Sequence, residues 1–242
     1  MAINTDMNPI VVEYRFQLED EQEYVYGFEI DAQTLQVIND QSEDLPSWTQ
    51  LANHQCPNCP LDNKRVPTCP AALNMVGLVS RFDQLLSHDK AKVLVNTAER
   101  TISSDTTIQH GVCSLMGLLM AASNCPLTAF FKPMARFHLP FASTDETIWR
   151  ATSTYVLSQY FLCREGRDPD LVFKGLSRMY NEIQTVNIAF AKRLRSACRQ
   201  DPMVNAIILL DMFAKSMPSA IEESLEELQH LFLPLLSHID PN

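Results

Sequence analysis

The stretch that decides the fold class is residues 11–38, VVEYRFQLEDEQEYVYGFEIDAQTLQVI. Large apolar side chains alternate with polar ones through Tyr14, Phe16 and Leu18, and the alternation resumes from Tyr24 to Ile30. A period of two is typical of a half-buried β-strand, and the polar run between the two halves is where a chain turns. The sequence therefore predicts an antiparallel β-hairpin or meander near the N-terminus.

Past residue 70 the apolar side chains recur at helical spacing. Leu73, Val76 and Val79 lie three residues apart, which is typical of an amphipathic helix, expected here at residues 71–87. A second short hairpin is expected at 92–96 and 100–103. Further helices are expected at 107–124, 127–137, 144–163, 171–198, 202–215 and 219–236. The predicted fold class is α+β, predominantly α, with the β-hairpin or meander and a cysteine loop followed by a helical bundle with one further short hairpin.

Two kinds of residue mark helix starts. Ser143 and Glu146 have the spacing of a capping box, in which the hydroxyl and the carboxylate each accept from the other residue's backbone amide. Pro202, which follows Asp201, and Pro218 are placed as first-turn prolines. We therefore divide the chain into a small antiparallel β module (1–46), a cysteine and proline loop (47–70) and a helical domain (71–242), which together form one compact unit.

Composition narrows the class of protein. The formal net charge of −10 disfavours binding to nucleic acid and to anionic membranes. We expect no secretory signal in the polar residues 1–10, and no run of the roughly 20 apolar residues that would span a bilayer. Seven cysteines, an odd number, are expected to stay reduced or to bind metal, and we place the protein in the cytoplasm.

The cysteines carry the clearest signal. Cys56, Cys59, Cys69 and Cys125 are each followed by proline. With only 14 prolines in 242 residues, four such dipeptides among seven cysteines are not explained by composition. Two cysteines separated by two residues can direct both sulfurs at one ion. The sequence therefore predicts a metal centre with these four thiolates as ligands.

The identity of the metal and one ligand stay open. An iron–sulfur cluster is favoured over Zn²⁺ because Pro60 excludes the positive φ that a zinc knuckle wants after its second cysteine. His54 or Cys113 could replace Cys125 as the fourth ligand. Cys56 and Cys59 could instead be a dithiol redox pair, although such a pair is normally placed between a strand and a helix start.

A second candidate is the segment MARFHLPF, residues 134–141. Arg136 and His138 could bind an anion, or could hydrogen-bond to a residue that itself binds the metal. The sequence holds no GxGxxG, GxxxxGK[ST], HExxH or GxSxG motif. Enzymatic activity is therefore not indicated.

The segments CPNCPLD, CPAALN, SLMGLLMAASNCP and MARFHLPF together resemble an uncharacterised family of bacterial cytoplasmic proteins over most of residues 50–230. The resemblance implies a bacterial source and one cysteine-proline package, but no activity. The leading hypothesis is a non-catalytic metal-binding sensor, regulator or accessory protein that acts on another protein and could form homo-oligomers. The alternatives are an oxidoreductase or electron-transfer component using the same centre, and a metal-free interaction scaffold.

Overall fold

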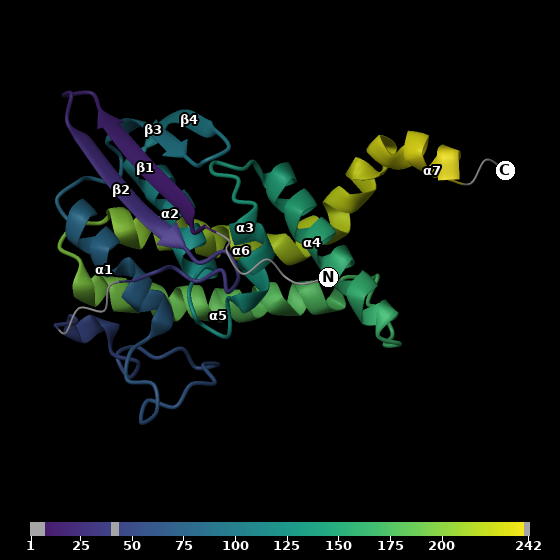
Figure 1. The fold of residues 1–242 in the computed structure, drawn as a ribbon, viewed down its shortest axis with the longest axis horizontal. Coiled ribbons are helices and arrows are strands. Elements are labelled where there is room, and N and C mark those ends of the chain that lie inside the picture. Colours follow the sequence, from purple (N-terminus) through teal and green to yellow (C-terminus); the bar gives the residue numbers. More distant parts are fainter. Residues whose placement is uncertain (1–7, 40–43, 240–242) are drawn as a thin grey trace. The chain divides into compact units, whose positions relative to one another are not determined.

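The computed structural model describes residues 8–39 and 44–239, and the side chains of residues 222–224 are not described. The chain forms two compact units (Figure 1). Unit 1 consists of Met1–Phe141 and Ile183–Asp211, and unit 2 consists of Ala142–Glu182 and Met212–Asn242. The sequence-based boundaries at residues 46 and 70 stay predictions.

Unit 1 contains a four-stranded antiparallel sheet in the order β2-β1-β3-β4. Its strands are β1 (Ile10–Leu18), β2 (Glu23–Ile30), β3 (Lys90–Asn96) and β4 (Thr101–Thr107). Tyr14 of β1 lies opposite Tyr26 of β2 on one side and Val95 of β3 on the other. The two predicted hairpins therefore exist, but they join through β1 and β3 into one sheet.

One face of this sheet is covered by helices (Figure 1). Phe16 of β1 is fully buried, and its ring centroid lies 4.7 Å from that of Phe82 in α1 (Pro70–Phe82). Gly111 of α2 (Ile108–Ala121) lies against Phe16 and Val93, since a Cβ atom at residue 111 would come within 2.5 Å and 3.0 Å of them. The buried side chains of β1 thus form one side of the core. α2 can pack closely against them because Gly111 has no side chain.

The remaining elements of unit 1 are either short or contribute residues to unit 2 as well. η1 (Ser47–Thr49) forms the start of the cysteine loop. η2 (Ala129–Phe131) runs directly into α3 (Lys132–Arg136), where a single helix was predicted. α5 (Lys174–Ala197) and α6 (Pro202–Leu228) each contribute residues to both units. Val186, Phe190 and Leu194 of α5 belong to the buried core of unit 1.

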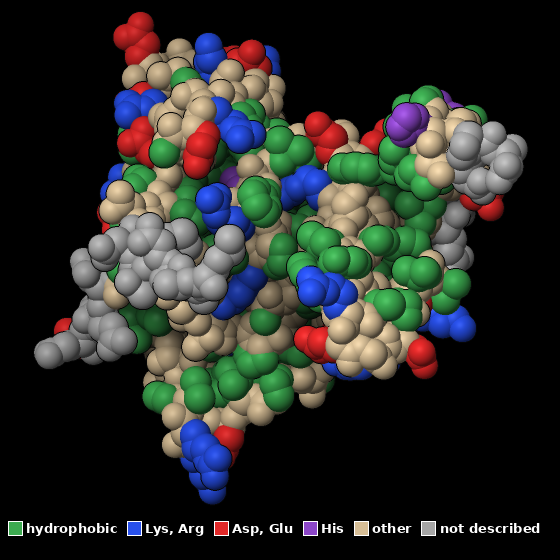
Figure 2. All heavy atoms as spheres, turned by 45° about the vertical axis from the view of Figure 1, so that its right-hand side comes forward, with side chains coloured by type: hydrophobic (Ala, Val, Ile, Leu, Met, Phe, Trp, Pro, Cys, Tyr) green, Lys and Arg blue, Asp and Glu red, His purple; other side chains and the backbone are tan. Residues whose placement is uncertain are grey.

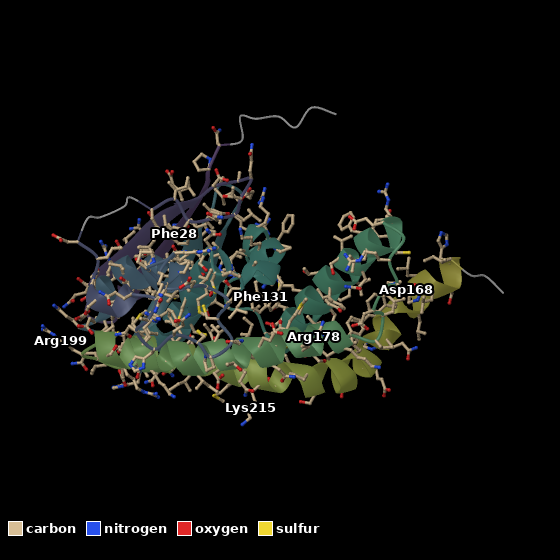
Figure 3. All side chains as sticks on the ribbon, turned by 90° about the horizontal axis from the view of Figure 1, so that it is seen from below. Phe28, Phe131, Asp168, Arg178, Arg199 and Lys215 are labelled. Carbon is tan, nitrogen blue, oxygen red and sulfur yellow. The ribbon has the colours of Figure 1, made fainter. Side chains whose placement is uncertain are left out.

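Unit 2 contains helices and the loops between them, and no strand, in the described residues. It contains α4 (Thr144–Arg164), residues 174–182 of α5, the part of α6 from Met212, η3 (Gln229–Phe232) and α7 (Leu233–Ile239). Figure 3 labels two of its charged residues, Asp168 in the loop after α4 and Arg178 on α5. Ser143 and Glu146 form the predicted capping box at the start of α4.

One sequence-based expectation about α6 is wrong. The helix continues through Pro218, which was expected to start a new helix; a proline at this position has no amide hydrogen to donate to the preceding turn. The segment Pro202–Ile221 is also long and apolar enough to cross a membrane, judged by length and composition alone. The apolar window of this segment is 28% buried, with Met203, Ala206 and Ile207 completely buried, and one such helix is weak evidence for a membrane span.

The predicted fold class, α+β and predominantly α, is confirmed. Its physical basis is simple: the strands alternate in burial and the helices bury one face. Within unit 1, the cysteine loop packs against the buried core that the sheet, α1, α2 and the C-terminal part of α5 form together.

Candidate functional site

The CPNC segment forms a hydrogen-bonded turn. The amide of Cys59 donates to the carbonyl of Cys56 at 3.0 Å, and Pro57 occupies the second position, where a fixed φ near −65° suits a turn. The side chain of Gln55 donates to the carbonyl of Leu61 at 2.9 Å and joins the two ends of the segment. The two cysteines are thus held close together by local interactions.

Cys69 is fixed by the strand-like start of the loop. Its amide donates to the carbonyl of Thr49 at 2.8 Å, and the amide of Leu51 donates to Pro67 at 2.7 Å. Cys69 then directly precedes α1, and Leu73 closes the first helical turn on its carbonyl at 3.0 Å. Only 8% of Cys69 is exposed.

Arg193 of α5 secures the same part of the loop from inside the protein. Its guanidinium group donates to the carbonyls of Trp48 and Gln50, both at 2.6 Å, and to that of Leu51 at 3.3 Å. The residue is 1% exposed. Burial lowers the pKa of Arg193, while the neighbouring thiols of Cys69, Cys56 and Cys59 act in the opposite direction. A buried cation therefore lies beside three of the four Cys-Pro cysteines.

Cys125 reaches the same region from the connection between α2 and η2. The hydroxyl of Ser123 accepts from the Cys125 amide at 3.2 Å, and the hydroxyl of Thr128 donates to its carbonyl at 3.3 Å. Thr128 also donates to the carbonyl of Met120 at 2.8 Å, which caps the end of α2. Like Cys69, Cys125 is 8% exposed.

The four thiols are electrostatic neighbours. Burial raises the pKa of Cys56 to about 12, and the proximity of Cys69, Cys125 and Cys59 adds to the effect. Burial also raises the pKa of Cys125, with Cys69 and Cys59 acting in the same sense. These residues, distant in sequence, therefore lie near one another, and burial disfavours the thiolate forms of Cys56 and Cys125.

The predicted metal-binding function is nevertheless wrong. Within the described residues, no group of three or more His, Cys, Asp or Glu side chains is arranged to hold a metal ion. A zinc or iron–sulfur site needs deprotonated sulfurs at about 2.3 Å from one metal. In this protein the thiols are neighbours that share a buried region, and all seven cysteines are free of disulfides.

The two alternative ligands lie elsewhere. His54 is exposed, on a residue with a φ of 47°. Cys113 is 7% exposed within α2, where its neighbour is the phenol of Tyr14. Burial raises the pKa of Cys113 to about 12. Cys113 thus packs against the sheet, and His54 faces solvent.

Arg136 and His138 have separate surroundings. Arg136 is exposed, and its guanidinium carbon lies 5.4 Å from the centroid of the Phe137 ring. His138 Nε2 lies 2.5 Å from the hydroxyl of Tyr14, which is also 3.0 Å from the hydroxyl of Ser114. Ser114, Tyr14 and His138 therefore form a hydrogen-bonded chain that fixes the RFHLPF segment to β1.

Comparison with known proteins shows the family. A family model described as a domain of unknown function, DUF6901, matches residues 12–233. The chain belongs to the DUF6901 family. A search of the curated proteins and a search of the solved structures find no match. The prediction that the chain belongs to an uncharacterised family is thus confirmed. The cysteine pattern as a mark of that family stays a prediction.

Two features of this DUF6901 chain escaped sequence analysis. Tyr14 was assigned only to a strand, and nothing in the spacing of Ser114 and His138 indicates that they meet there. Arg193 did carry a signal, since it follows Val186 and Phe190 on the apolar side of a helix. A charged residue on such a face needs buried partners, and here they are backbone carbonyls.

A third feature lies in unit 2. α4 buries Ile148, Ala151 and Tyr155, yet it also exposes large apolar side chains. They are Trp149 (47% exposed), Val156 (42%), Leu157 (54%), Tyr160 (53%) and Phe161 (53%). Figure 2 shows hydrophobic side chains gathered over much of this part of the DUF6901 chain.

Proposed function

We propose that the protein is a protein-binding component that self-associates through unit 2, with α4 at the centre of the interface. The single observation that carries the proposal is that α4 is apolar on two faces. Successive residues of a helix are about 100° apart, so Trp149, Val156 and Tyr160 fall within one narrow stripe. The buried residues Ile148 and Tyr155 lie on a different face. A helix that serves only its own core needs one apolar face.

The stripe continues onto the C-terminal helices of the same unit. The ring of Trp149 lies 5.4 Å from that of Phe232, centroid to centroid, which joins α4 to η3. The exposed large apolar residues of η3 and α7 are Leu231 (60%), Leu233 (53%), Leu235 (54%), Leu236 (50%) and Ile239 (69%). Together with the five exposed residues of α4, these five make up what we call the apolar surface of unit 2.

The size of this surface suits a dimer. A fully buried aromatic side chain removes about 150–250 Å² from water, so the half-exposed residues of α4 alone offer on the order of 500 Å². The residues of η3 and α7 bring the total toward the roughly 800 Å² per partner of a standard interface. Monomeric proteins rarely leave apolar patches of this size uncovered.

The charge pattern allows two copies to meet there. The chain carries a net charge of −10, which makes two copies repel each other over most of their surface. From Thr147 to Arg164, however, α4 contains no carboxylate, and its only charged residues are Arg150 and Arg164. Two copies related by a twofold axis would place this same acid-free, aromatic patch face to face.

The test is the oligomeric state of the full chain. Sedimentation equilibrium and light scattering should give a dimer for the wild type and a monomer for Val156→Glu/Tyr160→Glu, because the two carboxylates would be buried and would face like charges. Ile188→Glu is the matched control, since Ile188 is 49% exposed on α5 but lies in unit 1. Circular dichroism and urea unfolding confirm that each variant folds.

Two results would overturn the proposal. One is a wild type that stays monomeric at a concentration of about 100 µM, well above the dissociation constant of a micromolar dimer. The other is dissociation by Ile188→Glu to the same extent as by the α4 variant. If the wild type is monomeric and a different protein binds α4, then that protein, and not a second copy of this chain, covers the apolar surface of unit 2.

We also propose a cytoplasmic location and no binding to nucleic acid or membrane. The support is the net charge of −10 and the free state of all seven cysteines. Within the DUF6901 family we propose that the Cys-Pro segments and RFHLPF are retained together, because both lie in unit 1. An alignment of family members tests this.

A further inference from the structure

We propose that Cys56 and Cys59 are a redox modification site, in which the two thiols form a reversible disulfide on reaction with a small disulfide of the glutathione class. The site lies in unit 1 and does not depend on self-association through unit 2. The structure holds the two thiols in their reduced form.

The backbone is already shaped for this bond. A turn closed by the hydrogen bond from the Cys59 amide to the Cys56 carbonyl brings the Cα atoms of its first and fourth residues within about 7 Å of each other. A disulfide requires a Cα separation of about 4.4–6.8 Å. Pro57 restricts the turn, and the bond from Gln55 to Leu61 holds its ends. The disulfide can therefore form with little movement of the loop.

The two thiols are also more accessible than their neighbours. Cys56 and Cys59 are half-buried, whereas Cys69 and Cys125 are each 8% exposed. A small disulfide can reach the turn but not the two thiols behind it. Burial raises the pKa of Cys56, and the nearby guanidinium group of Arg193 partly offsets this effect.

The chemistry assigns different parts to the two sulfurs. Burial disfavours the anionic form of Cys56, and the proposal assigns the first attack to Cys59. The Cys59 thiolate displaces one thiolate from the small disulfide and forms a mixed disulfide. The Cys56 sulfur loses its proton, attacks the Cys59 sulfur and displaces the second thiolate. Two protein thiols are oxidised, one small disulfide is reduced, and both protons end on the two released thiols.

The experiment uses the full chain in the Cys163→Ser background, because Cys163 is exposed and would react by itself. The protein is equilibrated with reduced and oxidised glutathione at increasing ratios, alkylated and digested with trypsin. Cleavage after Lys64, Arg65 and Arg81 places the pair in peptide 16–64 and Cys69 in peptide 66–81. The expected product is peptide 16–64, two hydrogens lighter, with no attached glutathione.

Two variants distinguish the roles. Cys56→Ser should stop at one glutathione on Cys59, because no second thiol can displace it. Cys59→Ser should remain unmodified over the same range. The proposal is overturned if all thiols stay alkylated at every ratio, or if the disulfide joins peptide 16–64 to the peptide of Cys69 or to that of Cys125. It is also overturned if Cys59→Ser gains glutathione on Cys56.

Discussion

The guanidinium group of Arg193 donates a 2.6 Å hydrogen bond to the carbonyl of Trp48, a residue that precedes it by 145 positions. This contact and those to Gln50 and Leu51 tie the part of α5 that belongs to unit 1 to the start of the cysteine loop. All of these groups lie in the interior, so the loop depends on α5 for its position.

Arg193→Met should destabilise unit 1. Three carbonyls would lose their donor, and a buried acceptor left without a partner costs about 1–3 kcal/mol, so a total loss on the order of 3 kcal/mol is expected. Arg193→Lys should lose less, because one ammonium group keeps the charge but cannot serve three carbonyls in the same geometry. Urea unfolding measures the loss. Arg195→Met, at an exposed position of the same helix, should change it little.

Gly111→Ala should also destabilise unit 1. The new methyl group would meet Phe16 at 2.5 Å and Val93 at 3.0 Å, and overpacking of this kind costs about 1–3 kcal/mol. Gly117→Ala on the same helix is the matched control. Its methyl group would lie 3.5 Å from Leu210, an ordinary contact, so alanine should be neutral or stabilise the helix. Equal losses for the two variants would contradict the tight contact at Gly111.

Stability should fall as the pH rises above the ordinary range of thiols. The pKa values of Cys56, Cys113 and Cys198 are raised to about 12, chiefly by burial, whereas an unfolded chain ionises its thiols near about 8.5. Below that pH both states are protonated. Above it only the unfolded state releases protons, so the free energy of unfolding decreases with pH until the folded thiols ionise as well.

Urea unfolding from pH 7 to pH 10 under reducing conditions checks this. Removing one buried thiol, as in Cys113→Ala, should make the decline shallower by up to about 1.4 kcal/mol per pH unit. Cys163→Ala controls for the loss of a thiol at an exposed position. A slope that Cys113→Ala leaves unchanged would show that this thiol does not contribute.

Ser143→Ala should weaken the start of α4. The Ser143 hydroxyl accepts from the Glu146 amide at 3.2 Å, and the Glu146 carboxylate accepts from the Ser143 amide at 2.7 Å. Loss of such a cap costs about 1 kcal/mol. Hydrogen exchange at the first amides of α4 should quicken accordingly. Ser153→Ala, at an exposed position within α4, should leave these amides unaffected.

The proposed dimer should tighten with salt. Raising the ionic strength from about 0.05 M to 0.5 M screens the repulsion between two acidic copies, while the apolar contact does not weaken. Sedimentation equilibrium at both concentrations measures the dissociation constant. A dissociation constant that rises with salt would instead indicate an interface held by ion pairs.

The fold class was accessible from sequence because its signals are local. Alternation through Tyr14 and Phe16, helical spacing after residue 70 and the capping box at Ser143 each depend on residues close together in the chain. Pro218 misled the analysis, because a proline at a helix start and one inside a long helix look the same locally. The cysteine pattern indicated correctly that four thiols are neighbours. It did not show whether their sulfurs meet at one point.

By itself the sequence determined the two hairpins, most of the helices and the residue at which α4 begins. Only the tertiary structure decided that β1 and β3 pair, that Arg193 reaches Trp48, and that no described group of side chains holds a metal. The reason is physical. Periodicity and caps act over a few residues, whereas pairing, burial and ligand geometry depend on where remote segments come to rest when the core packs.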